Sequence, residues 1–240
     1  MKKNDRYFGN VNPDVLKQID VQAQSICEFG CGTGALANAY KALNPDCHYV
    51  GVELIPEALA QAEAVLDVAI VKNLDRVADW ALDVDLQKAL PLESFDYMIF
   101  GDVLEHLYDP AAVLAQAVAR LKPGGRVVAC IPNVQHWSSF AQLLIGSWPQ
   151  QEMGLFDKTH IRWFTLTDML ELFTRNDLQV LQVQPRVPAM NQQSEALKQQ
   201  LISLLQPAAA TMGVKNPQEF SMRLSALQFV IVGVKSTGNR

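Results

Sequence analysis

The sequence predicts an α/β protein with a doubly wound, seven-stranded, mostly parallel sheet and helices on both faces. Three observations predict this fold class. Short apolar segments of strand type alternate with helical segments of about ten residues, which is typical of parallel strands joined by right-handed crossovers. A glycine-rich loop follows the first strand-type segment. Two strand-type segments near the C-terminus are separated by about forty residues without a strand signal, and we expect them to end the sheet as an antiparallel pair.

The size and composition of the chain indicate a single domain over residues 1–240. Of its 240 residues 49% are hydrophobic and 19% are charged, which is enough for one sizeable core. The net charge of −5 provides no general attraction for nucleic acid or anionic lipid, so we expect neither as a partner. Without a signal-type segment or an apolar run of ~18 residues, the sequence predicts a cytoplasmic protein, and we expect a monomer or a homodimer.

Strands and helices are expected in turn through the first half of the chain. Asn12 before Pro13 predicts a capped helix start, and Asp109 before Pro110 repeats that signature. The glycines at 124–125 are expected to end the second of these helices. The expected strands cover residues 25–29, 48–53, 68–71, 95–100 and 126–132, and the expected helices cover 13–19, 35–43, 56–66 and 110–121.

The C-terminal part has a different pattern. Residues 178–185 and 226–235 are the two strands expected to pair in antiparallel fashion. Between them, residues 194–205 predict an inserted amphipathic helix that covers either a substrate pocket or a second subunit. Its expected apolar face carries Leu197, Leu201, Leu204 and Leu205. Upstream, Thr165 and Asp168 have the spacing of a capping box.

The loop after the first strand predicts a nucleoside site. Gly30, Gly32 and Gly34 alternate with other residues, and glycine permits positive φ and leaves no Cβ between the backbone and a ligand. Nineteen residues after Gly34 comes Glu53, at the end of the second strand, where a carboxylate can accept both ribose hydroxyls. This is a Rossmann-like arrangement at the carboxyl edge of the sheet. The alternative interpretation of the glycines is a tight strand-to-helix turn.

The loop sequence GCGTGA also satisfies the dinucleotide pattern G-x-G-x-x-G/A, so an NAD-dependent oxidoreductase is an alternative. Three features disfavour it. Glu28, two residues before the first glycine, is poorly placed for a pyrophosphate but well placed for a ligand with an ammonium group and a sulfonium. The second half of the chain also has no further glycine loop for a nicotinamide half, and no Tyr-x-x-x-Lys proton relay is present.

Four segments in order resemble the successive motifs of the class I S-adenosylmethionine-dependent methyltransferases, from about residue 25 to residue 133. They are EFGCGTG, VGVE, FDYMIFGDVLEHLYDP and LKPGGRVVACIPN. Residues 154–165, GLFDKTHIRWFT, are similar to a bacterial small-molecule subgroup often found beside sugar and cell-surface polysaccharide enzymes. The resemblance implies S-adenosyl-L-methionine as cofactor and S-adenosyl-L-homocysteine as product. It also implies a cofactor-binding half at about 1–133 and substrate-side segments at about 134–177 and 186–225.

The resemblance assigns cofactor contacts to positions of this chain. It implies that Glu28 and the three loop glycines surround the methionine part and that Glu53, with Leu54 beside it, holds the ribose. The family usually contacts adenine through an Asp after the third strand, whereas this chain has Asn73, followed by Leu74. The full set of expected cofactor-binding residues is Glu28, Gly30, Gly32, Gly34, Glu53, Leu54, Asn73, Leu74, Asp102 and Val103, the last two near the transferring methyl group.

Four histidines are candidates for acid–base chemistry, because an alcohol acceptor needs a base near the methyl group. His48 opens a strand far from the carboxyl edge and is interpreted as structural. The resemblance places His106 beside the methyl group. His160 lies in a polar run, 157–162, that aromatic residues enclose, and we expect it and His106 to be catalytic; local structural roles are the alternative for both.

The acceptor is expected to be a small molecule, held by His136, Arg162 and Trp163. The leading hypothesis is O-methylation of a sugar-like or other hydroxylated metabolite. N- or C-methylation of another small acceptor and a non-catalytic S-adenosylmethionine-binding regulatory protein are alternatives. A nucleic-acid methyltransferase is disfavoured because no Asn/Asp-Pro-Pro-aromatic motif follows Asp102. The four cysteines lack paired metal spacing, so we expect no metal site.

Overall fold

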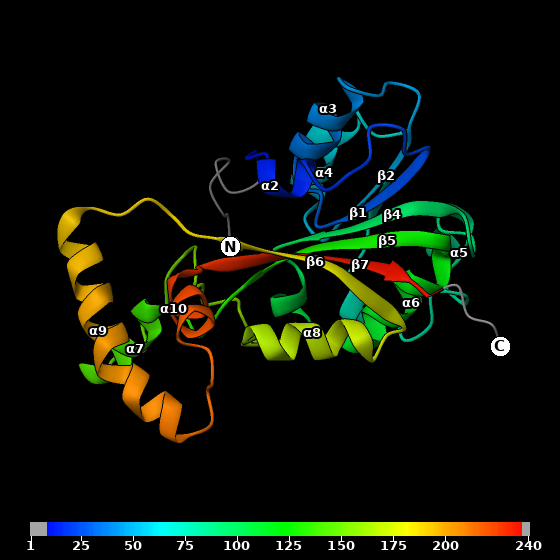
Figure 1. The fold of residues 1–240 in the computed structure, drawn as a ribbon. Helices are drawn as coiled ribbons and strands as arrows, with labels where there is room; N and C mark the ends of the chain where they lie inside the picture. Colours follow the sequence, from blue (N-terminus) through cyan, green and yellow to red (C-terminus); the bar gives the residue numbers. More distant parts are fainter. Residues whose placement is uncertain (1–8, 237–240) are drawn as a thin grey trace.

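The computed structural model describes residues 9–236 as one seven-stranded sheet with helices on both sides (Figure 1). The strand order is β3-β2-β1-β4-β5-β7-β6. The strands are β1 (Ser25–Phe29), β2 (His48–Glu53), β3 (Val68–Val71), β4 (Phe95–Gly101), β5 (Leu121–Pro132), β6 (Leu178–Arg186) and β7 (Gln228–Lys235). Strands β1 to β5 pair in parallel, whereas β7 pairs antiparallel with both β5 and β6. The predicted fold class, including its antiparallel C-terminal strand, is confirmed.

Helices cover both faces of this sheet (Figure 1). One face carries α2 (Pro13–Leu16), α3 (Ala35–Lys41) and α4 (Pro56–Ala62), and the other carries α5 (Val84–Ala89), α6 (Pro110–Arg120) and α8 (Leu166–Thr174). Alternate residues of a strand point to opposite faces, so Ile26 packs in one core cluster while Cys27 and Phe29 pack in the other. The buried faces leave the loops at the carboxyl ends of the parallel strands available for function.

The predicted helix starts are confirmed. Asn12 Oδ1 accepts a hydrogen bond from the backbone N–H of Asp14 at 3.1 Å, and Asp109 Oδ1 accepts one from Ala112 at 2.9 Å. Each cap is followed by a proline at the first helical position, where the missing N–H costs no intrahelical bond. The expected capping box at the start of α8 is also present. Helices α2, α3 and α4 end two to four residues earlier than their apolar spacing predicts.

The expected end of α6 at residues 124–125 is wrong. The helix ends at Arg120, and Leu121 already pairs with Phe95 of β4. The next paired residue is Arg126, opposite Tyr97, so the residues between them bulge out of the register. Gly124 has a φ of +77° within this bulge, which explains the glycine without a helix end.

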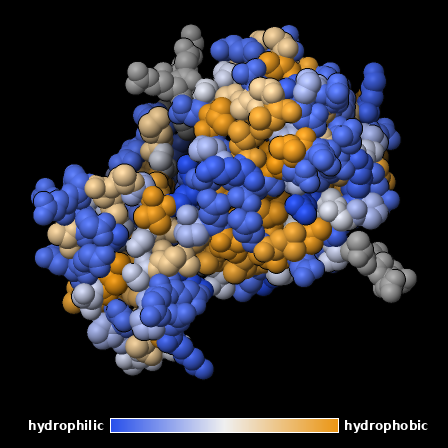
Figure 2. All heavy atoms as spheres, turned by 45° about the horizontal axis from the view of Figure 1, so that its top comes forward, coloured by the Kyte–Doolittle hydropathy of each residue, from blue (hydrophilic) through white to orange (hydrophobic). Residues whose placement is uncertain are grey.

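Helices α7 (Trp137–Leu144), α9 (Gln192–Thr211) and α10 (Pro217–Ser225) form a lobe beyond the carboxyl end of β5 (Figure 1). Ile202, Phe220 and Leu224 make its small core. The predicted leucine face of α9 is only partly buried: Leu201 is 5% exposed, whereas Leu204 is 67% exposed. On the face drawn in Figure 2, hydrophilic residues cover much of this lobe, with hydrophobic residues scattered among them. Within residues 9–236, no helix combines the length and apolarity needed to cross a membrane.

Candidate active site

The glycine loop turns sharply at the carboxyl end of β1. Gly30, Gly32 and Gly34 have φ values of +67°, +54° and +77°, a region that residues with a side chain rarely adopt. At Gly30 space also matters, because a Cβ there would lie 2.5 Å from Cγ2 of Val103. The loop therefore needs glycine both for its turn and for its close approach to the end of β4.

Glu53 ends β2 directly beside this loop. Its carboxylate accepts hydrogen bonds from three backbone N–H groups, those of Gly32 at 2.9 Å, Leu54 at 2.7 Å and Ile55 at 2.9 Å. A carboxylate has about four acceptor sites, so these bonds fix its orientation and leave capacity for a ligand hydroxyl. The side chain is buried, and it belongs to the wall of the cavity described below.

Glu28 is a buried carboxyl group one strand away. The hydroxyl of Tyr49 on β2 donates a hydrogen bond to Glu28 Oε2 at 2.8 Å. Burial raises the pKa of Glu28 to about 8, against the opposing effect of the Tyr49 hydrogen bond, and the charge of Glu53 adds to the rise. At neutral pH this carboxyl group holds a proton that a cationic ligand would displace.

Residues after β3 and in the loop after β2 add further side chains to the cavity wall. Asn73 follows β3 and caps the 3-10 helix η1 (Leu74–Arg76), because its Oδ1 accepts a hydrogen bond from Asp75 N at 3.0 Å. Leu74 is buried beside it, while Leu54 remains 54% exposed. All of these side chains border the same cavity, so the structure brings the expected ribose and adenine positions together.

Asp102 stands at the end of β4 in a conformation unusual for aspartate, with a φ of +55°. The amide of Gln228 on β7 donates a hydrogen bond to Asp102 Oδ1. Gln228 in turn accepts a hydrogen bond from Arg186 on β6, which also binds Asp14 at 3.0 Å. Burial raises the pKa of Asp102 to about 6, although the nearby Arg186 charge and the Gln228 hydrogen bond favour its ionised form.

The segment 155–162 lies against the 3-10 helix η2 (Leu104–His106) that follows β4. The backbone carbonyl of Glu105 accepts hydrogen bonds from the N–H groups of Ile161 and Arg162, both at 3.0 Å. The guanidinium of Arg162 also donates to the carbonyl of Tyr108. These bonds hold two segments together that are more than fifty residues apart in the chain.

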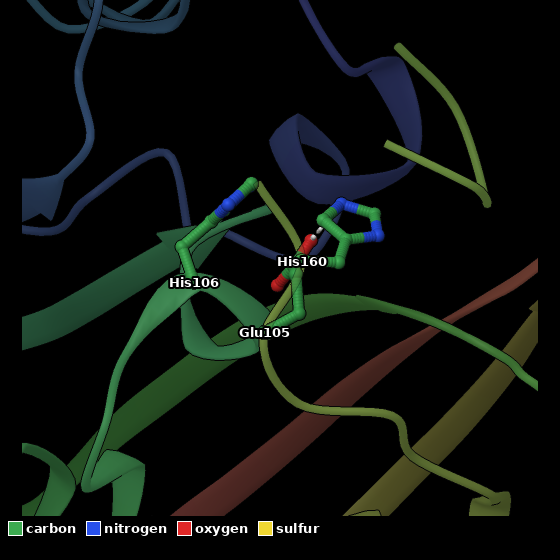
Figure 3. Close-up of side chains that lie close together, drawn as sticks. All are labelled: Glu105, His106 and His160. Carbon is green, nitrogen blue, oxygen red and sulfur yellow. Dashed lines mark ion pairs between the residues drawn. The ribbon is translucent and has the colours of Figure 1, made fainter. Parts of the chain in front are cut away.

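This contact brings His106 and His160 side by side, with ring centroids 4.8 Å apart in an edge-to-face arrangement (Figure 3). Glu105 completes the cluster, since its Oε1 lies 3.8 Å from His160 Nε2. The Nδ1 atom of His106 lies 3.0 Å from the carbonyl oxygen of Thr159, and that of His160 lies 3.1 Å from the carbonyl oxygen of Leu155. A carbonyl can only accept, so both rings carry hydrogen on Nδ1.

One cavity of about 1020 Å³ connects these groups. Its wall includes both expected catalytic histidines, His106 and His160, and nine of the ten expected cofactor-binding residues: Glu28, Gly30, Gly32, Glu53, Leu54, Asn73, Leu74, Asp102 and Val103. The tenth, Gly34, belongs to the same loop but does not border the cavity. The volume accommodates a nucleoside-sized cofactor together with a small acceptor.

The three expected acceptor-binding residues lie outside this wall. His136 is buried and caps α7, with its Nδ1 2.7 Å from Ser138 Oγ, and burial lowers its pKa to about 4, with a smaller effect from Lys198. Arg162 holds the Tyr108 carbonyl, as described above. Trp163 packs edge-to-face against Trp148 at 4.9 Å.

Three groups of the site were missed from the sequence. Tyr49 is an ordinary strand residue in the sequence, and only the register of β2 against β1 puts its hydroxyl on Glu28. Gln228 comes from a strand 126 residues beyond its partner Asp102. Glu105 is polar in an apolar context, directly before His106, and that signal could have marked it as a functional residue.

A family model described as a methyltransferase domain matches residues 6–183. A ubiquinone biosynthesis O-methyltransferase of Rhodopseudomonas palustris is 31% identical over 120 residues, which cover 50% of this chain and 44% of that protein. A protein of the same description from Albidiferax ferrireducens is 30% identical over 146 residues, covering 59% of this chain and 56% of that protein. The chain spans about half the length of these curated relatives.

Solved structures share the fold along almost the whole chain. A S-adenosylmethionine-dependent methyltransferase from Mesorhizobium loti superposes with a TM-score of 0.59 and 17% identity, covering 92% of this chain and 96% of that one. A SAM-dependent methyltransferase from Archaeoglobus fulgidus has a TM-score of 0.60 and 14% identity, covering 96% and 97%. At such identities the likeness concerns the fold.

Proposed function

The chain belongs to the class I S-adenosylmethionine-dependent methyltransferase family, and from this premise we propose that it transfers a methyl group from S-adenosylmethionine to an oxygen of a small hydroxylated acceptor. The observation that carries the proposal is the shared cavity. Residues that follow β1, β2, β3 and β4 border it, together with two histidines from separate segments, His106 and His160.

Each end of the cofactor has a chemically suitable partner. Glu28 offers a buried carboxylate to the ammonium group of the methionine part, and Glu53 offers an oriented carboxylate to the ribose hydroxyls. Asn73 and Leu74 take the adenine, with an amide in place of the family's usual carboxylate. Asp102 and Val103, which border the same cavity as the two histidines, are then expected near the transferring methyl group.

Two observations support oxygen as the acceptor atom. The curated relatives are named O-methyltransferases, and His106 and His160 supply imidazole nitrogens at the acceptor end of the cavity. In the transfer, an imidazole takes the hydroxyl proton, the oxygen attacks the methyl carbon, and the carbon–sulfur bond breaks with its electron pair going to sulfur. The products are the methyl ether and S-adenosylhomocysteine.

We expect the segments 134–177 and 186–225 to bind the acceptor; of these, residues between 153 and 160 contribute to the cavity wall. Arg162 and Trp163 closely follow His160 in the sequence, and the Trp163 ring packs against the His160 ring at 5.8 Å, so we expect both to contact an acceptor that extends beyond the cavity. His136, at the N-cap of α7, is the third expected acceptor contact. Within this account a sugar-like metabolite is a suitable acceptor, because adjacent hydroxyl groups match a wall with several hydrogen-bonding groups.

The test is methyl transfer from labelled S-adenosylmethionine to a panel of small hydroxylated compounds. His160→Ala is expected to lower turnover about 10²–10⁴-fold while the affinity for S-adenosylhomocysteine is retained. His48→Ala is the matched control, because that histidine is half exposed at the other edge of the sheet. Cofactor binding without transfer to any acceptor would instead favour a regulatory S-adenosylmethionine-binding protein.

A further inference from the structure

We propose that Glu105, His106 and His160 bind a divalent transition-metal ion at the acceptor end of the cavity. The binding stands on the geometry of these three side chains alone. The role of the ion in methyl transfer, by contrast, rests on the proposed function. From the spacing of the cysteines we expected no metal site, but these donors come from two distant segments that only the fold brings together.

The three side chains converge from two directions (Figure 3). One ligand atom from each, a carboxylate oxygen and two ring nitrogens, lies within 4.8 Å of the others. Donors bound to one ion at about 2.0–2.2 Å lie at most about 4.4 Å apart, so the ion must draw the cluster together by only a few tenths of an ångström. The side chains of Glu105 and His160 are just 1% and 5% exposed, which shields the cluster from bulk water.

The histidine rings are oriented as ligands. Both place hydrogen on Nδ1 for a backbone carbonyl, Thr159 O for His106 and Leu155 O for His160. That tautomer has its lone pair on Nε2, and a carbonyl partner on the other nitrogen is the usual outer-shell contact of a metal-bound histidine. In His160 the same Nε2 faces the Glu105 carboxylate at 3.8 Å, longer than a hydrogen bond and compatible with two donors on one ion.

The backbone around the cluster is preorganised. Glu105 presents its carbonyl oxygen to two N–H groups of the segment that carries His160, both at 3.0 Å. Ring hydrogen bonds from both histidines add to this connection. Because the two segments are already joined, little conformational entropy is lost when the ion binds.

The chemical nature of the three donor atoms indicates which metal ions the site would bind. Imidazole suits Zn²⁺, Fe²⁺, Co²⁺ and Ni²⁺, whereas Mg²⁺ and Ca²⁺ prefer sites made of oxygen alone. Two neutral imidazoles and one carboxylate also leave coordination positions open, as in catalytic zinc sites with three protein ligands. His106 and His160 border the cavity, so an acceptor hydroxyl can occupy an open position.

The ion changes how the acceptor is activated. With both Nε2 atoms engaged as ligands, the imidazoles no longer take the proton. The ion would instead lower the pKa of an acceptor hydroxyl at an open coordination position, and the proton would leave through the cavity that His106 and His160 border. The acceptor oxygen would then attack the methyl carbon, and the carbon–sulfur electron pair would go to sulfur as before. The three residues thus determine specificity for acceptors that present a hydroxyl group to the ion.

The experiment titrates metal-free protein, prepared by dialysis against a chelator, with Co²⁺ alone. We expect one ion per chain by calorimetry, together with visible absorption bands typical of Co²⁺ with nitrogen and oxygen ligands. Glu105→Gln, His106→Gln and His160→Gln are each expected to weaken Co²⁺ binding at least about 10–100-fold, the range for disturbing a metal-binding shell. His48→Gln is the matched control and should bind as the unchanged protein does, since His48 lies away from the cluster.

The affinity for S-adenosylhomocysteine, measured on the same samples, separates this proposal from the proposed function. Retained cofactor affinity in the three variants shows that they are folded. The metal proposal is overturned if neither Co²⁺ nor Zn²⁺ binds with saturation, or if all three variants bind them as tightly as the unchanged protein. Metal binding without any S-adenosylhomocysteine binding would uphold the metal site and overturn the proposed function.

Discussion

We expect cofactor binding to depend on pH, because burial raises the pKa of Glu28 and we propose that this group contacts the ammonium group of the cofactor. Burial holds this pKa at about 8, so at pH 7 only about a tenth of the protein has Glu28 ionised. A ligand with an ammonium group beside Glu28 binds the ionised form. Binding at pH 7 should therefore release about 0.9 proton, and the affinity should rise about tenfold between pH 6 and pH 7 before it levels off near pH 8. The ligand's own α-amino group, with a pKa of about 7.7–8.0, remains charged over most of this range.

Calorimetry with S-adenosylhomocysteine in two buffers of different ionisation enthalpy measures the released proton directly. Glu28→Gln should remove both the proton release and the pH dependence. Tyr49→Phe removes a hydrogen bond that favours the ionised carboxylate. The rise of the S-adenosylhomocysteine affinity with pH should therefore occur at higher pH. Glu63→Gln is the control, because it makes the same substitution at an exposed position. An affinity that does not change between pH 6 and pH 8 in the unchanged protein would refute this reasoning.

The same shift affects the stability of the ligand-free protein. Glu28 has a higher pKa in the folded state than the ordinary value of 4.5, so the folded protein binds the proton more tightly than the unfolded chain does. The free energy of unfolding therefore falls as pH rises from about 4.5 to about 8, by up to ~1.4 kcal/mol per pH unit, and this contribution is constant above that window. In Glu28→Gln, denaturant titrations should show a smaller fall of the free energy of unfolding between about pH 4.5 and about pH 8.

Three further substitutions test separate parts of the account. Gly30→Ala should weaken S-adenosylhomocysteine binding at least tenfold in calorimetry, because the new methyl group would overlap a valine methyl at 2.5 Å; Gly146→Ala, with a similar φ of +72° and open space, should leave binding unchanged. Glu53→Ala should weaken cofactor binding by about 1–3 kcal/mol through loss of the ribose partner, and an unchanged affinity would place the ribose elsewhere. Ile202→Ala should destabilise the lobe by about 2–5 kcal/mol in thermal or denaturant unfolding without altering cofactor affinity, and a matching loss of cofactor affinity would show that the lobe and the cavity are coupled.

Local signals in the sequence were enough for most of the fold. The caps at Asn12 and Asp109 and the strand-type runs at 25–29 and 48–53 depend on neighbouring residues, and the structure has them as predicted. The beginning of β5 could not be predicted in this way. There, pairing of Leu121 with Phe95 overrides a glycine pair that normally signals a helix end, and the extra residues bulge out.

The candidate site likewise has one part that local sequence signals predict and another part that depends on long-range contacts. The glycines and Glu53 could be predicted because their spacing follows from one strand–loop–helix unit and the next strand. The partners that set the chemistry could not, since they depend on register and on long-range contacts. The hydroxyl of Tyr49 on Glu28 and the meeting of His160 with Glu105 both require the folded sheet edge.

The central claim is that the cavity beside the glycine loop binds S-adenosylmethionine, and calorimetric titration with S-adenosylhomocysteine tests it most directly. We expect saturable binding of one molecule per chain, a rise in melting temperature with ligand concentration, and no comparable effect of NAD. Binding of NAD with no binding of S-adenosylhomocysteine would contradict it.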